Sequence, residues 1–274
     1  MKIGFIGFGH MAGAMAKGFI KSGFLTAGDI YACASDYDKL VMRAEEHFSQ
    51  GDSDTSCGQN NTDSGIHCLK SPSDVANASD VVIIAVKPNQ VEDVIYPITD
   101  DLFGKVLISV AFGWDFDRYD KLIPEVGHIS IIPNTPCEVC MGMTIIEDKN
   151  NLSRSTLNMV EMLLRSLGEI EYFPTNKMWL AGELTSCGPA FAAMFIEALG
   201  DAGAEYGLDK EKAYRIVSQM VAGTGTLQIE TGKLPGQMTK EVATPGGITI
   251  KGVTALREAG FHEIVAKAID AIEK

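Results

Sequence analysis

The first residues whose spacing suits a chemical role are Gly7-Phe8-Gly9-His10-Met11-Ala12, which fit the pattern G-x-G-x-x-A. The motif follows an apolar segment, Lys2 to Gly7, and precedes apolar residues at helical spacing, which is the strand–turn–helix context of a dinucleotide-binding turn. Gly7 allows the tight turn, and Gly9 lets the backbone approach a pyrophosphate at the helix N-terminus. Ala12 permits close contact between helix and sheet. A purely structural turn is the alternative interpretation.

The residues Ala34-Ser35-Asp36 end the next predicted strand, over 29–34. At this place an acidic residue favours a free ribose 2′-hydroxyl, whereas Ser or Arg favours a 2′-phosphate. Asp36 comes one or two residues late, and no Arg is nearby in the sequence. The motif therefore leaves the choice between NADH and NADPH open, and Asp36 is equally well explained as the N-cap of a following helix.

Three further predicted strands end in residues that suit a ligand site. Val86-Lys87-Pro88 closes the strand over 80–86, Ser109 to Gly113 closes the strand over 105–111, and Pro133-Asn134-Thr135-Pro136 follows the strand over 128–132. Ligands of open α/β sheets bind at the carboxyl ends of the strands. Lys87 can contact a cofactor phosphate or ribose there, although a solvated lysine is the alternative, and the Asn134 amide offers both a donor and an acceptor.

A glycine-rich turn, Ala243 to Thr249, lies between two helical patterns near the end of the sequence. Pro245-Gly246-Gly247, followed by Thr249 and a helix, exposes backbone N–H groups at a helix start with hydroxyl groups beside them. Such an arrangement suits a carboxylate. A plain turn between helices is the alternative.

The elements that must position these groups divide the chain into a mixed part and a helical part. Up to Pro174, predicted strands alternate with helices; further strands are expected over 143–147 and 169–173, and helices over 73–78 and 153–167. Buried strands alternating with helices predict a parallel sheet covered on both faces. We therefore expect a dinucleotide-binding domain over residues 1–174.

After Pro174 the strand signal stops. Helices are expected from Pro189 to Tyr206, from a cap at Asp209 to about Thr231, and over the apolar stripe that starts at Phe261. Gly223 and Gly225 suggest close helix packing, within one chain or between two. We therefore expect an all-α domain over residues 175–274. The polar segment from Gly51 to Gly65 is expected to be an exposed loop.

The composition of the chain argues against some classes of function. The 23 Lys and Arg against 36 Asp and Glu give a net charge of −13 without a basic block, which argues against a nucleic-acid partner. No apolar run is long enough to span a membrane, so we expect a cytoplasmic protein with a small-molecule substrate. Six scattered cysteines are interpreted as free thiols, and we expect no metal site. A redox couple or half a metal site is the alternative for Cys137 and Cys140, which form a C-x-x-C pair.

Taken together, the motifs resemble those of the pyrroline-5-carboxylate reductase family, over nearly the whole chain. The segments that carry the resemblance are IGFIGFGHMA at 3–12, AVKP at 85–88, PNTP at 133–136, TSCGPAF at 185–191 and TPGGITIKG at 244–252. Departures from the family pattern are Thr185-Ser186-Cys187 in the glycine–proline run, Leu234 before Pro235 where His is common, Ser130 where Arg is common, and an insertion at 51–65.

The resemblance implies an α/β fold in which an N-terminal Rossmann-type doubly wound sheet precedes an all-α C-terminal dimerisation domain. It implies NADPH as cofactor, with NADH as an alternative, a homodimer, and in many members a decamer. The cofactor-binding residues that it implies are Ile6, Gly7, Phe8, Gly9, His10, Met11, Ser35, Asp36, Ala85, Val86, Lys87, Pro88, Val110, Ala111 and Phe112.

The implied reaction is reduction of 1-pyrroline-5-carboxylate to L-proline. By the same resemblance, Thr244, Gly246, Gly247 and Thr249 hold the substrate carboxylate and ring nitrogen, with Thr249 as the catalytic residue. One rival is a two-domain hydroxy-acid dehydrogenase, which would need a lysine on the helix after the Rossmann domain. Between Pro174 and Gly207 the only lysine is Lys177, before the predicted helix. The other rival is a dinucleotide sensor without catalytic activity.

Overall fold

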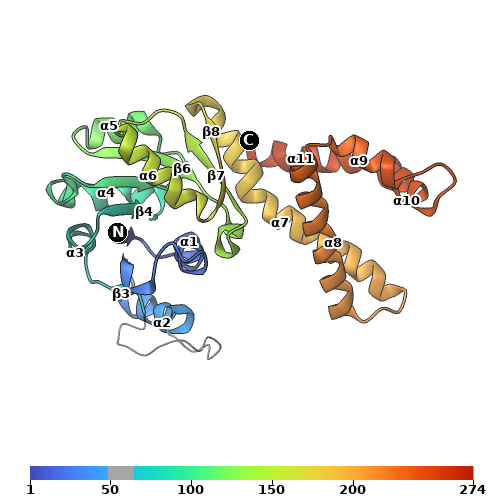
Figure 1. The fold of residues 1–274 in the computed structure, drawn as a ribbon, viewed down its shortest axis with the longest axis horizontal. Helices are drawn as coiled ribbons and strands as arrows, with labels where there is room; N and C mark the ends of the chain where they lie inside the picture. The colour runs from blue at the N-terminus through green and yellow to red at the C-terminus, as the bar shows by residue number, and fades with distance from the viewer. Residues whose placement is uncertain (49–64, 274) are drawn as a thin grey trace. The chain divides into compact units, whose positions relative to one another are not determined.

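The computed structural model describes residues 1–48 and 65–273 (Figure 1). The loop predicted at 51–65 therefore lies, except for its last residue, outside the described residues. The chain forms two compact units, Met1–Pro189 and Ala190–Lys274. The division falls inside a helix that begins at Thr175, and the domain boundary predicted between residues 174 and 175 stays a prediction.

The first unit is built on an eight-stranded sheet with the order β3-β2-β1-β4-β5-β6-β7-β8 (Figure 1). Its strands are β1 (Ile3–Ile6), β2 (Ile30–Cys33), β3 (His67–Cys68), β4 (Val81–Ile84), β5 (Val106–Ser109), β6 (Gly127–Ile132), β7 (Gly142–Glu147) and β8 (Gly168–Phe173). The strand order moves outward from β1 in both directions, as in a Rossmann-type sheet. The short strand β3 was not predicted.

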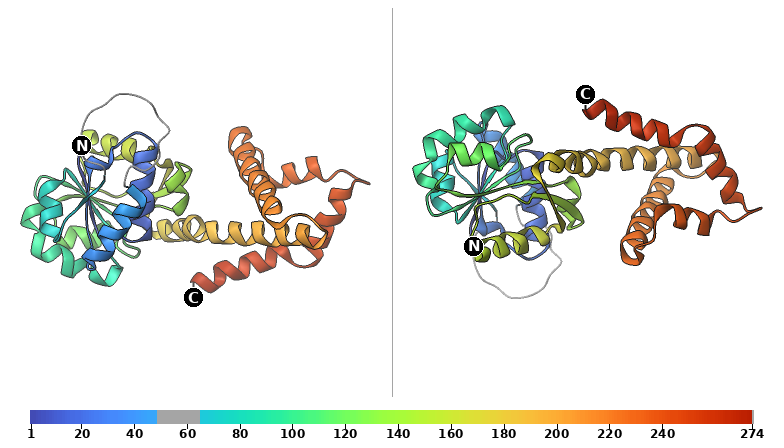
Figure 2. Two further views of the ribbon diagram at one scale, coloured as in Figure 1. Left: turned by 90° about the horizontal axis from the view of Figure 1, so that it is seen from below. Right: turned by 90° about the horizontal axis from the view of Figure 1, so that it is seen from above.

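Helices cover both faces of this sheet (Figure 2). They are α1 (His10–Lys21), α2 (Tyr37–Phe48), α3 (Pro72–Ala78), α4 (Val91–Ile95), α5 (Phe116–Leu122) and α6 (Arg154–Arg165). Successive residues of a strand point to opposite faces. In β4, Val81 and Ile83 accordingly join one buried cluster, while Val82 and Ile84 join another. The predicted doubly wound architecture is therefore confirmed.

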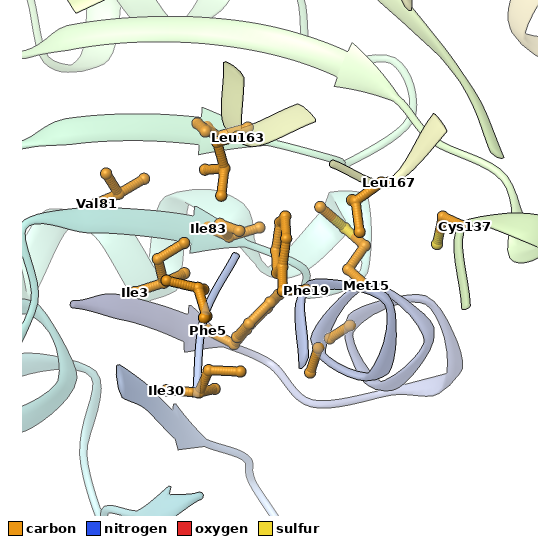
Figure 3. Packing of buried hydrophobic residues seen from close by; sticks show 14 of the residues in the cluster. Ile3, Phe5, Met15, Phe19, Ile30, Val81, Ile83, Cys137, Leu163 and Leu167 are labelled. Atoms are coloured by element: carbon orange, nitrogen blue, oxygen red, sulfur yellow. The ribbon is translucent and has the colours of Figure 1, made fainter. Parts of the chain in front are cut away.

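Side chains of α1 and α6 fill the core on one face (Figure 3). Met15 and Phe19 from α1 are fully buried, as are Leu163 from α6 and Leu167 just after it. Burial of each such side chain contributes roughly 1.5–3 kcal/mol to stability. This packing holds α1 and α6 against the same face of the sheet.

The prediction of an all-parallel sheet is wrong for the last two strands. β7 runs antiparallel to β6, with Ile131 opposite Ile146, and β8 pairs in parallel with β7. The cause is the short link at residues 133–141, because a parallel crossover needs about a dozen residues or more. That link holds only the short 3₁₀ segment η5 (Thr135–Val139), so the chain has to turn back.

The helix predicted to start at Pro189 starts much earlier. α7 runs from Thr175 to Glu205, and Pro189 lies inside it. Proline is common at the first turn of a helix, which made it a reasonable start signal. The preceding turns are nevertheless helical because they pack on the sheet, where Met178 is fully buried beside Ile132 and Ile145. Lys177 consequently lies within the helix, and not before it.

The second unit is entirely helical, as predicted. After the end of α7 it contains α8 (Lys210–Thr231), α9 (Pro235–Val242), α10 (Ile248–Glu258) and α11 (Phe261–Glu273). Asp209 caps α8 as expected, since its side chain accepts the Lys212 N–H at 3.0 Å. A methyl group built on Gly223 or Gly225 meets no described atom within 4 Å, so neither glycine makes the expected close contact within this chain.

Large apolar side chains of the helical unit are exposed in the single chain. They include Met194, Leu199, Ile216, Leu227, Ile229, Ile264 and Val265. Exposed apolar surface of this extent marks an interaction surface. None of the helices in the part of the chain that the structure describes is both long enough and apolar enough to cross a membrane.

The buried carboxylate of Glu147, at the end of β7, ties together the first turns of two helices. It accepts the Phe116 N–H of α5 at 2.7 Å and a hydrogen bond from the Thr175 hydroxyl of α7. Burial raises the pKa of Glu147 above its ordinary value of 4.5, and the two hydrogen bonds oppose this shift only in part. Glu147 therefore fixes where α7 begins, at a cost in desolvation.

We predict that Glu147→Gln stabilises the fold increasingly as the pH rises. The raised pKa means that the folded protein binds the Glu147 proton more tightly than the unfolded chain, so this group's contribution to stability is lost as the pH rises through the folded pKa. The glutamine oxygen can still accept the Phe116 N–H without carrying a charge. The measurement is the free energy of unfolding in urea between about pH 4 and about pH 8.

The control for this experiment is Glu171→Gln, which neutralises an exposed carboxylate on β8. A pH-independent difference between the Glu147→Gln variant and the unmodified protein would show that Glu147 does not titrate as described.

Candidate active site

A cavity of about 640 Å³ opens at the carboxyl ends of β1, β2 and β4. Nine of the predicted cofactor residues line it, namely Ile6, Gly7, Phe8, Gly9, Ser35, Asp36, Ala85, Val86 and Lys87. They come from three separate strand ends, and the sheet order brings them together because β1 lies between β2 and β4. This is the position at which open α/β sheets bind their ligands.

The glycine motif has the geometry that a dinucleotide pyrophosphate needs. Gly7 has a φ of +90°, and a Cβ atom there would lie 2.7 Å from the Ala85 carbonyl oxygen, so only glycine fits between β1 and β4. Gly9 occupies the N-cap position of α1, and no side chain caps the first N–H groups of this helix. A Cβ atom on Gly9 would meet nothing within 4 Å. The helix N-terminus thus has open space beside Gly9, and the first N–H groups of a helix, which lack partners within it, favour an anion there.

The remaining predicted cofactor residues do not line this cavity. His10 and Met11 form the first turn of α1, and Pro88 begins the 3₁₀ segment η2 (Pro88–Gln90). Val110, Ala111 and Phe112 follow β5, the strand next to β4. Their roles as cofactor ligands stay predictions.

The strand ends of β4 and β5 are nevertheless held together. The Val110 N–H donates to the Ile84 carbonyl at 3.0 Å, and the Trp114 indole N–H donates to the Pro88 carbonyl at 2.8 Å. Phe112 is about half exposed, and its ring lies edge-on to Trp179 of α7 with 4.9 Å between ring centroids. A rigid rim therefore extends from the cavity toward the start of α7.

Asp36 is engaged as a helix cap. Its Oδ1 atom accepts the Lys39 N–H at 3.0 Å at the start of α2, which is one of the two roles that the sequence left open. Ser35 remains exposed beside it at the cavity. The Asp36 carboxylate, which would bind a free ribose 2′-hydroxyl, is thus already engaged through one oxygen. The Ser35 hydroxyl, which would suit a 2′-phosphate, lies exposed at the cavity.

Three cationic side chains that the sequence reasoning missed line the same cavity: Lys39 and Arg43 from α2, and Lys70 from the loop before α3. No Arg adjoins Asp36 in the sequence, but the fold brings Arg43 to the cavity, where a guanidinium nitrogen donates to the Phe8 carbonyl at 3.0 Å. The available signal was the spacing of Lys39 and Arg43, because residues four apart share a helix face. With Lys87, four cations line this cavity against the single carboxylate of Asp36, among the residues that the structure describes.

The thiol at this cavity is inert. Cys33 is almost fully buried, and burial raises its pKa to about 11. Cys137 is fully buried too, with its pKa raised to about 12 by the same cause. Cys33, Cys68, Cys137, Cys140 and Cys187 are all free thiols, and Cys57 lies outside the described residues. Cys33 therefore remains a neutral thiol and does not act as a nucleophile.

The glycine-rich turn of the helical unit connects α9 to α10. Gly246 has a φ of +78°, and the Gly247 N–H donates to the Thr244 carbonyl at 3.1 Å, which closes a β-turn. Gly247 is the N-cap of α10 and has no side-chain cap. Because the Gly247 amide is used inside the turn, the donors at the helix start are the amides of Ile248 and Thr249, with the exposed hydroxyls of Thr244 and Thr249 nearby in the sequence.

Comparison with known proteins bears on both units. Residues 175–274 match the family model described as pyrroline-5-carboxylate reductase dimerisation, and residues 2–113 match the model described as NADP oxidoreductase, coenzyme F420-dependent. A pyrroline-5-carboxylate reductase of Treponema pallidum is 37% identical to the chain, over 99% of the chain and 98% of the relative. The chain belongs to the pyrroline-5-carboxylate reductase family.

Other members of the family agree in sequence and in fold. The pyrroline-5-carboxylate reductase of Escherichia coli is 31% identical over 98% of the chain and 94% of its own length. The solved structure of the Plasmodium falciparum pyrroline carboxylate reductase with NADP bound has a TM-score of 0.81 at 26% identity, covering 99% of the chain and 95% of that protein. The Streptococcus pyogenes enzyme gives a TM-score of 0.80 at 27% identity, covering 99% and 96%.

We predict that Gly9→Ala weakens NADPH binding by roughly tenfold or more without destabilising the fold. The new methyl group would stand in the open space that a pyrophosphate has to occupy, and displacing a charged ligand from helix N–H groups costs of the order of a buried charge-assisted hydrogen bond. The measurement pairs an NADPH titration with a thermal unfolding curve.

Gly13→Ala is the matched control on the same helix, since a Cβ atom there also meets nothing within 4 Å. It is expected to stabilise α1 slightly and to leave NADPH affinity unchanged. Equal effects of the two substitutions on NADPH affinity would contradict the assignment of Gly9.

Proposed function

We propose that the chain catalyses the reduction of 1-pyrroline-5-carboxylate to L-proline, with NADPH as hydride donor, as the last step of proline synthesis. The observation that carries this proposal is the match over 99% of the chain to a reductase of that name. The cavity at β1, β2 and β4 supports it, because its glycines and cations fit a phosphorylated dinucleotide.

Reduction of the cyclic imine requires little acid–base catalysis by the protein. When bound, reduced nicotinamide supplies the hydride that reduces the carbon of the C=N bond, and the nitrogen ends protonated. An iminium is already electrophilic, so positioning of the two reactants is the main requirement. The residues assigned to the substrate accordingly include no histidine, cysteine or carboxylate.

The turn before α10 supplies the substrate contacts in this proposal. The N–H groups at the start of α10 and the Thr244 hydroxyl bind the substrate carboxylate, since an uncapped helix N-terminus favours an anion. The Gly246 amide also binds the carboxylate in this proposal, Gly247 closes the turn, and Thr249 hydrogen-bonds the ring nitrogen. This replaces the expectation that the Gly247 amide itself binds the carboxylate, because that amide already donates within the turn.

Cofactor preference follows from the charges at the cavity. Ser35, Lys39, Arg43 and Lys70 together provide a hydroxyl and three cations where the adenosine ribose lies in this class of sheet. Phosphate is recognised by such charge-assisted contacts. We therefore propose NADPH as the preferred cofactor, with NADH as a poorer substitute.

Assembly and location complete the proposal. The match to a dimerisation model and the exposed apolar side chains of the helical unit support a homodimer. A decamer and a cytoplasmic location are further parts of the proposal, the second suggested by the free cysteines.

The direct test follows NADPH absorbance in the presence of the cyclic imine, then NADH, then a panel of 2-oxo acids. The proposal predicts imine-dependent oxidation that is faster with NADPH. Turnover of 2-oxo acids alone would favour the hydroxy-acid dehydrogenase, and tight cofactor binding without turnover would favour the sensor. Lys177, the lysine that the dehydrogenase would need, is exposed in the first turn of α7.

We predict that Thr249→Val lowers kcat for imine reduction far more than it lowers NADPH affinity. Valine keeps the shape of threonine but cannot hydrogen-bond the ring nitrogen, and loss of one such bond costs roughly tenfold or more in rate. Thr249→Ser, which keeps the hydroxyl, is the control. An unchanged rate in the valine variant would remove Thr249 from the mechanism.

We also predict that Lys70→Gln reduces kcat/KM with NADPH by roughly tenfold and leaves kcat/KM with NADH nearly unchanged. The lost cation would otherwise pair with the 2′-phosphate, which NADH lacks. Lys21→Gln, at the far end of α1, is the control for the change in net charge. A parallel fall with both cofactors would contradict the role of Lys70.

A further inference from the structure

The Asn134 side chain bridges two backbone segments at the carboxyl end of β6. Its Nδ2 atom donates to the Thr185 carbonyl of α7 at 3.0 Å, and its Oδ1 atom accepts the Met143 N–H of β7 at 2.9 Å. The orientation of the amide follows from its partners, since a carbonyl only accepts and an N–H only donates. Asn134 is largely buried, so water does not replace these bonds freely.

The Thr185 carbonyl needs this donor because of Pro189. In an uninterrupted α-helix the carbonyl of residue 185 accepts the N–H of residue 189, but proline has no N–H and its ring crowds the carbonyl four residues earlier. Asn134 therefore supplies the hydrogen bond that Pro189 removes, from a strand end 51 residues away in the sequence. The Thr185 hydroxyl cannot do so, as it bonds back to the Ala181 and Gly182 carbonyls.

This bond lies where α7 completes its packing on the sheet. Met178 is buried against β6 and β7, and a Cβ atom on Gly182 would lie only 2.2 Å from Ile132, so helix and strand are in close contact up to this turn. Pro189 is also the last residue of the first compact unit. The continuity of α7 as a helix across Pro189 therefore depends on how the turn at Thr185 is held.

We propose that Asn134 is a positioning residue for the reductase reaction, which keeps α7 helical across Pro189 by completing the hydrogen bonding of the Thr185 carbonyl. α7 is the covalent link between the sheet that carries the cofactor cavity and the unit that carries the turn at 244–249. Asn134 touches neither reactant in this role. The kinetic part of the inference rests on the proposed function, whereas the hydrogen-bond part does not.

The test is a double-mutant cycle between Asn134→Asp and Pro189→Ala. Aspartate keeps the acceptor for the Met143 N–H but loses the donor to Thr185, while alanine at 189 restores a backbone N–H to the Thr185 carbonyl. Each variant is measured in the full-length protein for thermal unfolding, NADPH affinity, and kcat and KM with the cyclic imine.

Asn151→Asp is the matched control. Asn151 makes the same kind of bridge at the start of β6, accepting the His128 N–H at 2.8 Å and donating to the Val126 carbonyl at 3.1 Å. It is not bonded to α7, so its substitution should lower the unfolding temperature without a specific loss of imine turnover.

The proposal expects Asn134→Asp to lower kcat/KM for the imine by roughly tenfold, the factor that one buried hydrogen bond represents, with NADPH affinity unchanged. In the Pro189→Ala background the same substitution should have a much smaller effect on both the unfolding temperature and kcat/KM. If Asn134→Asp alone does not fold, the double variant is expected to fold and to retain activity.

Equal effects of Asn134→Asp in both backgrounds, or a loss of NADPH affinity parallel to the loss of turnover, would overturn the proposal. Absence of imine reduction in the unmodified protein would instead count against the proposed function. The coupling in unfolding temperature would then still decide whether Asn134 compensates for Pro189.

Discussion

The structure depends on the contact between β1 and β4 at Gly7, where two strand ends and a helix start meet with no space for a side chain. Because Gly7 lies against the Ala85 carbonyl, the chain leaves β1 sharply and begins α1 at once. The N-cap of α1, Gly9, then lies at the same cavity that the ends of β2 and β4 line. A site for a dinucleotide is therefore a consequence of how the central strands end.

Electrostatics explain how an acidic protein of net charge −13 can bind a polyanionic cofactor. The cations are local, and Asp36, the one carboxylate in the described lining of the cavity, caps the start of α2 by accepting the Lys39 N–H. Charge at the site thus differs in sign from charge on the whole molecule. Local fields of this kind govern ligand binding more than net charge does.

Sequence patterns predicted the elements whose signals are local. The G-x-G-x-x-A turn, the Asp209 cap and the strands β1, β4 and β5 each depend on neighbouring residues. The start of α7 could not be predicted, because Pro189 is tolerated through the distant Asn134 amide and the packing of Met178. The antiparallel direction of β7 follows from the short link between β6 and β7 at residues 133–141. Residue propensities, from which the strands were predicted, do not depend on the length of such a link.

The same distinction between local signals and distant contacts holds for the candidate site. Residues at strand ends were found, since the carboxyl edge of a sheet is a general ligand site. Lys39 and Arg43 were missed because they lie along α2, beyond the end of β2, and Lys70 because it follows the unpredicted strand β3. All three are brought to the cavity by tertiary structure.

The most direct measurement is a crystal structure of the protein with NADPH and L-proline bound. The account predicts the pyrophosphate at the N–H groups that follow Gly9, the 2′-phosphate beside Lys39, Arg43 and Lys70, and the proline carboxylate at the start of α10. A dinucleotide bound away from the α1 N-terminus, or a proline carboxylate held by residues outside the turn at 244–249, would contradict it.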